Sequence, residues 1–267
     1  MARLALLVFA VGLATGCQTL EKWFGPDQVK LGEAYADQTD GPTFDHAAFT
    51  AVLEAVVRED GRVDYPKLAA DPSGLDAYLA ALASLTGAAY DALPRNEKLA
   101  LLINAYNAFT LKLIAERWPV KSIQDIPASE RWDHRRWKLA GMTVSLNDIE
   151  HEHLRKKFRE PRMHFAVNCA SEGCPPIRRF AYTGADIDAQ LQGSATRAHA
   201  DPRWLQLKGD TVYLTRLYLW YRGDFEQVAG SPVAFAARFS PPLAEKLAKG
   251  EVTVEIMEYD WAINLAR

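Results

Sequence analysis

The chain has 267 residues, with 31 Lys or Arg against 34 Asp or Glu, so its formal net charge at neutral pH is -3. Its basic residues form no long tract that would follow a phosphate backbone, which argues against nucleic acid as a partner. Only three cysteines are present, too few for a fold built on a framework of disulfides. The length suffices for one large domain with a buried core.

The N-terminus is typical of an exported bacterial lipoprotein. Arg3 precedes an uncharged apolar run over residues 4–14 that is too short to span a bilayer, as expected of a signal peptide. Residues 13–17 (LATGC) resemble the lipobox, in which the cysteine receives the lipid. An ordinary cleaved signal with a chance cysteine is the alternative. We therefore predict a signal peptide over residues 1–16 and lipidation of Cys17, with Gln18 typical of proteins sent to the outer membrane.

A polar segment over residues 17–42 contains several glycines and prolines and shows little periodicity, which predicts a flexible tether between lipid and domain. A single domain over residues 43–267 then completes the chain. We expect a protein of the cell envelope that is anchored to the membrane through the lipid on Cys17 and faces the periplasm, from the outer membrane.

The first half of the domain is predicted to be helical. Apolar residues at helical spacing indicate a helix that ends near Val57, and a turn into a short strand follows at residues 60–65. A second helix is predicted over residues 74–85. The segment from Pro94 to Trp118 is apolar enough to be the central helix of the core.

The middle of the chain places an acid inside an apolar pattern. Residues 136–144 are predicted as a hairpin, and Ser145 and Asp148 have the spacing of a capping box that starts a helix ending near Phe158. On a helical wheel, Glu150 lies near the centre of the apolar arc. Because a lone buried carboxylate is costly, we expect a histidine or arginine partner for Glu150.

Residues 163–169 are predicted as a buried strand, followed by a tight loop that exposes a thiol and offers backbone N–H groups to an anion. Here Cys169 is the candidate nucleophile, His164 or His151 the candidate base, and Glu150 the candidate orienting group, because a cysteine nucleophile requires these three types. A structural disulfide between Cys169 and Cys174 is the alternative.

Four further polar residues are candidates for binding: Asn104, Asn107, Asn168 and Ser171. The asparagines at 104 and 107 share one helical face, where buried amides that satisfy loop backbone are the commoner case. No paired spacing of metal ligands is present, so neither a metal nor another cofactor is expected.

The sequence resembles the domain of unknown function 547 family over nearly the whole domain. The motifs that carry the resemblance are residues 103–108 (INAYNA), 145–151 (SLNDIEH) with Leu154-Arg155, 161–171 (PRMHFAVNCAS), Trp220-Tyr221 with Asp224-Phe225, and Tyr259-Asp260-Trp261. The aromatic residues of the last two motifs are predicted to be packing clusters. A distant likeness to papain-type cysteine peptidases and transglutaminases would need a permuted or unrelated arrangement, because here the cysteine follows its candidate histidines, opposite to the papain order.

The strands are not separated by regular helices, which favours an α+β fold over a doubly wound sheet. We expect a helical N-terminal half packed on a small antiparallel sheet from segments near Thr143, His164, Val212 and Val254, with a distant cysteine-peptidase-like core. The predicted function is a thiol-dependent hydrolase or acyl transferase acting on an amide or peptide-like substrate in the envelope. The alternative is a non-catalytic binding module whose loop is closed by the disulfide.

Overall fold

The computed structural model describes residues 29–267, so the predicted signal peptide and Cys17 lie outside the described residues. The elements of the first part are α2 (Ala47–Val56), α3 (Tyr65–Ala70), α4 (Ser73–Ser84), α5 (Gly87–Asp91), α6 (Arg95–Arg117), η1 (Ile123–Asp125), η2 (Ala128–Glu130), β1 (Trp137–Leu139), β2 (Met142–Val144), η3 (Asp148–Arg155) and η4 (Pro161–Phe165). Those of the second part are α7 (Ile187–Ala200), β3 (Leu205–Lys208), β4 (Thr211–Leu214), α8 (Leu217–Trp220), α9 (Arg222–Ala229), α10 (Pro232–Ala237), α11 (Pro241–Ala248) and β5 (Thr253–Ile256). The fold is α+β, as predicted.

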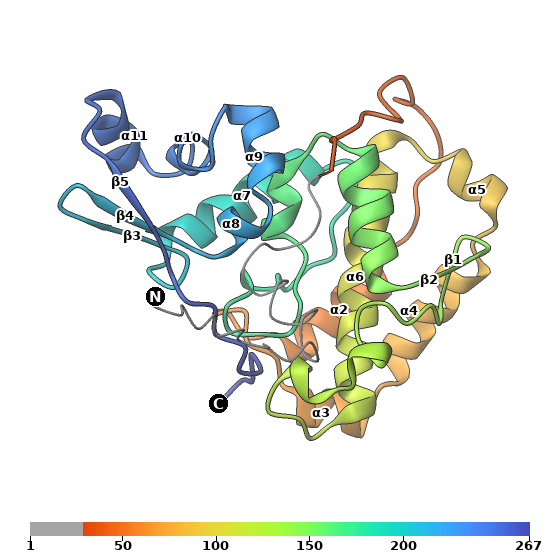
Figure 1. The fold of residues 1–267 in the computed structure, drawn as a ribbon. Coiled ribbons are helices and arrows are strands. Elements are labelled where there is room, and N and C mark those ends of the chain that lie inside the picture. Colours follow the sequence, from red (N-terminus) through yellow and green to blue (C-terminus); the bar gives the residue numbers. More distant parts are fainter. Residues whose placement is uncertain (1–28) are drawn as a thin grey trace, which may run out of the picture.

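The long helix α6 is the centre of the larger core. It is buried around most of its circumference, so other elements cover it on nearly all sides. Helices α3 and α4 and the helix η3 pack directly against it. In Figure 1, α2 to α6 occupy one side of the molecule, whereas β3 to β5 and α7 to α11 occupy the other.

A smaller core lies under the three-stranded sheet of the second part. It contains Phe165, Tyr218, Phe225, Phe235 and Leu243, all buried. Strands β3 and β4 are antiparallel, whereas β4 and β5 are parallel. The expected single antiparallel sheet is therefore corrected: the segments near Val212 and Val254 pair in parallel, and Thr143 belongs to the separate β1–β2 hairpin.

The predicted strand over residues 163–169 is wrong. Its first half is the 3-10 helix η4, which begins at Pro161, and the rest has no regular structure. The apolar run is buried because η4 packs against α7 and α9, not because it pairs with a strand. Short apolar runs do not distinguish a buried strand from a buried turn of helix, which explains the error. His164 is accordingly not part of a sheet.

Residues 29–42 contact the domain. The backbone N–H of Leu31 donates to Gln227, Glu33 forms an ion pair with Arg95, and Gln38 accepts a hydrogen bond from Lys98. The described part of the predicted tether is thus packed on the domain.

Among the described residues, α6 is the one helix long and apolar enough to cross a membrane, by length and composition alone. In its most apolar stretch, 83% of the residues are buried inside the protein, as expected of a core helix.

A close backbone contact fixes the loop that follows the second cysteine. Gly61 has a φ of +84°, and a Cβ built on it would lie 2.3 Å from Cβ of Pro176. Gly209, in the turn between β3 and β4, also has a positive φ, but nothing lies within 4 Å of its Cβ position. Both glycines therefore have a left-handed backbone conformation, but only at Gly61 would an added side chain also clash with a neighbour.

We predict that Gly61→Ala lowers the free energy of unfolding by about 2 to 4 kcal/mol, and Gly209→Ala by about 1 kcal/mol, because only the first adds a clash to the left-handed strain. Urea unfolding followed by circular dichroism measures both. Equal losses in the two variants would contradict the close contact between Gly61 and Pro176.

Candidate functional site

A cavity of about 340 Å³, here called the central cavity, lies between the two parts of the fold. It is lined by all four predicted catalytic residues: Glu150, His151, His164 and Cys169. Its other walls are largely aromatic and come from α6, the segment after η2, the region of α8 and the C-terminal segment. They include Tyr106, Trp132, Trp220, Tyr221, Tyr259 and Trp261. A concave site with apolar walls and a few converging polar groups is the usual form of a small-molecule site.

The predicted thiol is part of a disulfide in this structure. Cys169 and Cys174 are joined across a six-residue loop, with their Cα atoms 6.2 Å apart. Asn168 clamps this loop: its side-chain N–H donates to the carbonyl of Pro175 at 2.8 Å, and its side-chain oxygen accepts from the backbone N–H of Ala170 at 2.8 Å. Ala170 has a φ of +65°, a strained conformation for a residue with a Cβ, which the clamp maintains.

The loop is also tied to the C-terminal segment. The backbone N–H groups of Glu172 and Gly173 donate to the carbonyls of Ala262 and Asp260, both at 2.8 Å. The N–H of Cys174 donates to the carbonyl of Ser171. These N–H groups are therefore satisfied internally, and the expected anion site on the loop backbone is absent at these positions.

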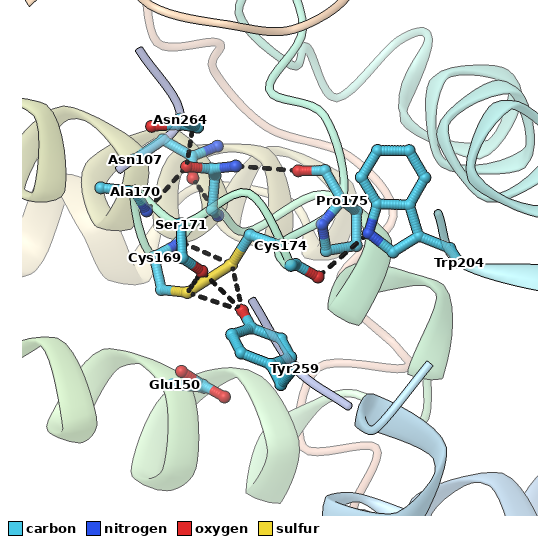
Figure 2. The surroundings of a disulfide bond; sticks show 12 residues. Asn107, Glu150, Cys169, Ala170, Ser171, Cys174, Pro175, Trp204, Tyr259 and Asn264 are labelled. Atoms are coloured by element: carbon cyan, nitrogen blue, oxygen red, sulfur yellow. Dashed lines mark hydrogen bonds between the residues drawn. A yellow bond between two sulfur atoms is a disulfide. The ribbon is translucent and has the colours of Figure 1, made fainter. Parts of the chain in front are cut away.

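Hydroxyl groups surround the two sulfur atoms. Sγ of Cys169 lies 3.2 Å from the hydroxyl of Ser171 and 3.1 Å from that of Tyr259, and the two hydroxyls are 2.8 Å apart. The Tyr259 hydroxyl also donates to Sγ of Cys174 at 3.2 Å (Figure 2). Ser171, one of the candidate binding residues, thus lies next to the sulfur of Cys169.

The buried position predicted for Glu150 is confirmed, since the residue is 5% exposed. The capping box also forms: Ser145 and Asp148 exchange reciprocal hydrogen bonds at 2.9 Å and start η3, a π-helix. Glu150 accepts a hydrogen bond from the hydroxyl of Tyr221 and interacts with that of Tyr106. Its direct partners are therefore tyrosines, whereas the expected partners were histidine or arginine.

Burial alone would raise the pKa of Glu150, yet that pKa is lowered below its usual value. Electrostatic interactions with the imidazoles of His151 and His164 are the largest opposing effects, followed by the Tyr221 hydrogen bond and Arg155. Glu150 is consequently a charged carboxylate inside the protein. The expected cations do surround it, at longer range than a hydrogen bond.

A second buried acid holds the predicted base. Nε2 of His164 lies 2.8 Å from a carboxylate oxygen of Asp224, and Arg155 binds both oxygens of the same carboxylate at 2.7 and 2.9 Å. Asp224 and Arg155 are fully buried and His164 is 2% exposed. Burial alone would raise the pKa of Asp224, but these two partners lower it to about 2. The orienting acid of His164 is therefore Asp224 and not Glu150.

The two candidate histidines have different environments. Nδ1 of His151 lies 3.1 Å from Nη1 of Arg155, whose guanidinium is only a donor. His151 must then accept at Nδ1, so its proton is on Nε2. His164 stacks on the ring of Tyr221 with centroids 3.9 Å apart, and its Nδ1 has no hydrogen-bond partner among residues 29–267.

The two helical asparagines support loops from α6. Asn107 donates to the carbonyl of Ala166 at 2.9 Å and accepts from the backbone of Asn168 at 2.8 Å. Asn104 makes the same pair of bonds with the backbone of Tyr182, outside the lining of the central cavity. Both amides are buried, so their observed contacts are the loop-satisfying ones.

Sequence reasoning missed three residues of the site: Arg155, Asp224 and Tyr259. All three lie in motifs of the family resemblance, which was the available signal. The motif at 220–225 was interpreted as packing because aromatic residues dominate it. Within the described range of the chain, no group of three or more His, Cys, Asp or Glu side chains is arranged to hold a metal ion.

Residues 90–197 match the model of a family described as "Protein of unknown function, DUF547". The match supports the resemblance to this family over a stretch that contains Glu150, His164 and Cys169, whereas Asp224 lies beyond it. No curated protein and no solved structure gives a significant match to the chain. The likeness to cysteine peptidases consequently stays a prediction.

We predict that Asp224→Asn lowers the free energy of unfolding at pH 7 by about 3 to 5 kcal/mol, because it leaves the buried guanidinium of Arg155 without its counter-charge. Asp188→Asn is the matched control, since Asp188 pairs with Arg162 but its side chain is 86% exposed. It should change stability little, because exposed ion pairs contribute little. Urea unfolding of both variants measures the difference, and similar losses would contradict the buried pair.

The same carboxylate predicts a dependence on pH. A carboxyl whose pKa is depressed from 3.8 to about 2 stabilises the folded state above pH 4, and this contribution is lost as the pH falls through 2. Between pH 4 and pH 2 the wild type should therefore lose about 2 kcal/mol that Asp224→Asn does not lose. Parallel acid dependences in the two proteins would show that Asp224 is not the titrating group.

Proposed function

We propose that this protein is a thiol-dependent hydrolase or acyl transferase of the cell envelope, with an amide or peptide-like substrate. Reduced Cys169 is the nucleophile and His164 the base. One observation carries the proposal: the central cavity gathers the sulfur of Cys169 and a histidine whose other ring nitrogen is fixed by a buried aspartate. Base and orienting acid in this relation are the arrangement that activates serine and cysteine nucleophiles.

The hydrogen bonds favour His164 over His151 as the base. When Nε2–H of His164 donates to Asp224, Nδ1 has a free lone pair and no partner among the described residues, so it can accept a proton. Neutral His151 has the opposite tautomer, because its Nδ1 already accepts from Arg155. Its Nε2–H can donate to a substrate oxygen, which is a positioning role rather than a basic one.

The reaction proceeds in two halves. His164 takes the proton of the Cys169 thiol, and the thiolate attacks the carbonyl carbon of the amide. The C–N bond of the tetrahedral intermediate then breaks, and the leaving amine takes the proton from His164. Water or an acceptor amine attacks the resulting thioester and releases Cys169. Trp220 offers a further donor to the substrate, since its buried Nε1–H has no partner among residues 29–267.

Glu150 contributes a fixed negative charge next to the two histidines. Its carboxylate and the Asp224 carboxylate lie close to the guanidinium of Arg155 and to the imidazoles of His151 and His164. A negative charge next to the imidazole stabilises the imidazolium that forms when His164 takes the proton. Glu150 thus assists the base through charge, while Asp224 orients it.

A non-catalytic binding module is the second candidate, and the disulfide favours it. With Cys169 joined to Cys174, the thiol cannot act, and the loop is a rigid wall of the central cavity. The two candidates differ in the reactivity of Cys169 after reduction. Catalysis requires a thiolate near neutral pH, whereas a binding module does not.

We predict that, after reduction, iodoacetamide alkylates Cys169 near pH 7 much faster than Cys174, because His164 lowers the pKa of the thiol below its free value of about 8.5. His164→Ala should slow the alkylation of Cys169 by roughly tenfold, as expected when the thiolate fraction at pH 7 falls by one pKa unit. Peptide mass spectrometry at several pH values gives the rate for each cysteine.

His153→Ala is the matched control, because His153 lies on the same π-helix as Glu150 but not in the lining of the central cavity. It should leave the rate unchanged. Equal labelling of Cys169 and Cys174 in the wild type, unaffected by His164→Ala, would favour the binding module.

The proposed location in the envelope depends on Cys17. We predict that Cys17→Ser releases the protein from the membrane fraction and abolishes labelling by a radioactive fatty acid, because the lipid would be the anchor. Cys174→Ser, which changes a cysteine inside the domain, should stay labelled and membrane-bound. A wild-type protein that is soluble in the periplasm and carries no fatty acid would refute the anchor.

A further inference from the structure

We propose that the Cys169–Cys174 pair performs thiol–disulfide exchange with an external dithiol that enters the central cavity. In this exchange Cys169 is the sulfur attacked and Cys174 the leaving thiolate. The exchange itself needs no amide substrate. The proposal rests on the proposed function in one respect only: if Cys169 is the nucleophile, exchange is the reaction that releases it.

The exposure of the two residues determines which sulfur an incoming thiol meets. Both residues line the central cavity, but Cys169 is partly exposed, whereas Cys174 is 6% exposed. Attack on a disulfide requires a direct approach to one sulfur, so access selects the target. The incoming thiolate therefore bonds to Sγ of Cys169.

The hydrogen bonds determine which sulfur leaves. The backbone N–H of Cys169 donates to Sγ of Cys174 at 2.9 Å, whereas the hydroxyl of Tyr259 lies close to both sulfur atoms, 3.2 Å from that of Cys174 and 3.1 Å from that of Cys169. Donors aimed at a sulfur favour its thiolate over its thiol, and a more stable thiolate leaves faster. The buried sulfur thus has the support that a leaving group needs, although its burial alone would disfavour a charge.

The electrons balance in two steps. One thiolate of the dithiol attacks Cys169, a new S–S bond forms, and the electron pair of the old bond moves to Cys174. The second thiolate of the dithiol then attacks its own first sulfur and expels Cys169 as a thiolate. The reductant ends as a disulfide, having lost two electrons, and the protein ends with two thiolates, which become thiols by taking up the two protons that the dithiol released.

The clamped loop keeps the pair together in the reduced state. The side chain of Asn168 forms hydrogen bonds to the backbone of Ala170 and of Pro175, and Asn107 accepts a hydrogen bond from the backbone of Asn168. None of these bonds involves sulfur, so they survive reduction. Cys174 therefore stays next to Cys169 and reverses any mixed disulfide formed there, which makes the intermediate short-lived unless Cys174 is removed.

Single-cysteine variants test the direction of exchange. The full chain in detergent, as Cys174→Ser or Cys169→Ser, is reduced, treated with glutathione disulfide under native conditions, and mapped by peptide mass spectrometry. The Cys174→Ser protein should accumulate glutathione on Cys169 at least about tenfold faster than the Cys169→Ser protein does on Cys174, since access limits the latter. Equal rates, or faster reaction of Cys174, would overturn the assigned direction.

The wild-type pair tests the leaving group. Reduction by dithiothreitol, quenched by alkylation, should be slowed by roughly three- to tenfold in Tyr259→Phe, which loses one donor to the leaving thiolate. Tyr213→Phe on β4 is the matched control and should reduce at the wild-type rate. A pair that resists dithiothreitol in the folded protein, or an unchanged rate in Tyr259→Phe, would overturn the proposal.

The two proposals fail separately in these experiments. If exchange fails, Cys174→Ser still presents a free Cys169 whose alkylation reports on His164. If instead Cys169 shows no elevated reactivity toward iodoacetamide while exchange follows the assigned direction, the cysteine pair is a redox site and the proposed hydrolase function is wrong.

Discussion

The structure of the central cavity depends on one buried ion pair. Asp224 and Arg155 are withdrawn from water, and each charge is tolerable only because the other lies within hydrogen-bonding distance. The pair joins the helix η3 to α9, two elements separated by 69 positions in the chain. It also fixes the ring of His164, because the same carboxylate oxygen accepts from both Arg155 and His164.

The disulfide loop, which forms another wall of the central cavity, is held in place by the side-chain amides of two asparagines. Asn107 on α6 satisfies the backbone on both sides of Val167, and Asn168 then satisfies the backbone inside the disulfide loop, at Ala170, and directly after it, at Pro175. Buried backbone groups must find partners, and a loop that lacks regular structure finds them in side chains. The position of Cys169 is consequently set by the core helix through two asparagines, which explains how an irregular loop can hold this residue in place.

Tyrosine side chains connect the region of the buried ion pair with that of the disulfide loop. Tyr221 touches Glu150 with its hydroxyl and His164 with its ring, while Tyr259 touches both sulfur atoms. Burial raises the pKa of both tyrosines, so these hydroxyls stay protonated donors near neutral pH. The cavity therefore offers donors next to the sulfur and acceptors next to the cations, a separation that suits a reaction in which a proton moves from sulfur to nitrogen.

Several local features of this protein can be predicted from its sequence. The many apolar residues of α6, the capping box at Ser145 and the burial of Glu150 all follow from the pattern of residues within one segment, which local geometry translates directly into structure. Only the tertiary structure decided the pairing between segments: Asp224 with His164, the disulfide between the two cysteines, and the helical form of residues 161–165. These outcomes depend on which distant elements pack together, and periodicity within a segment carries no information about its partner.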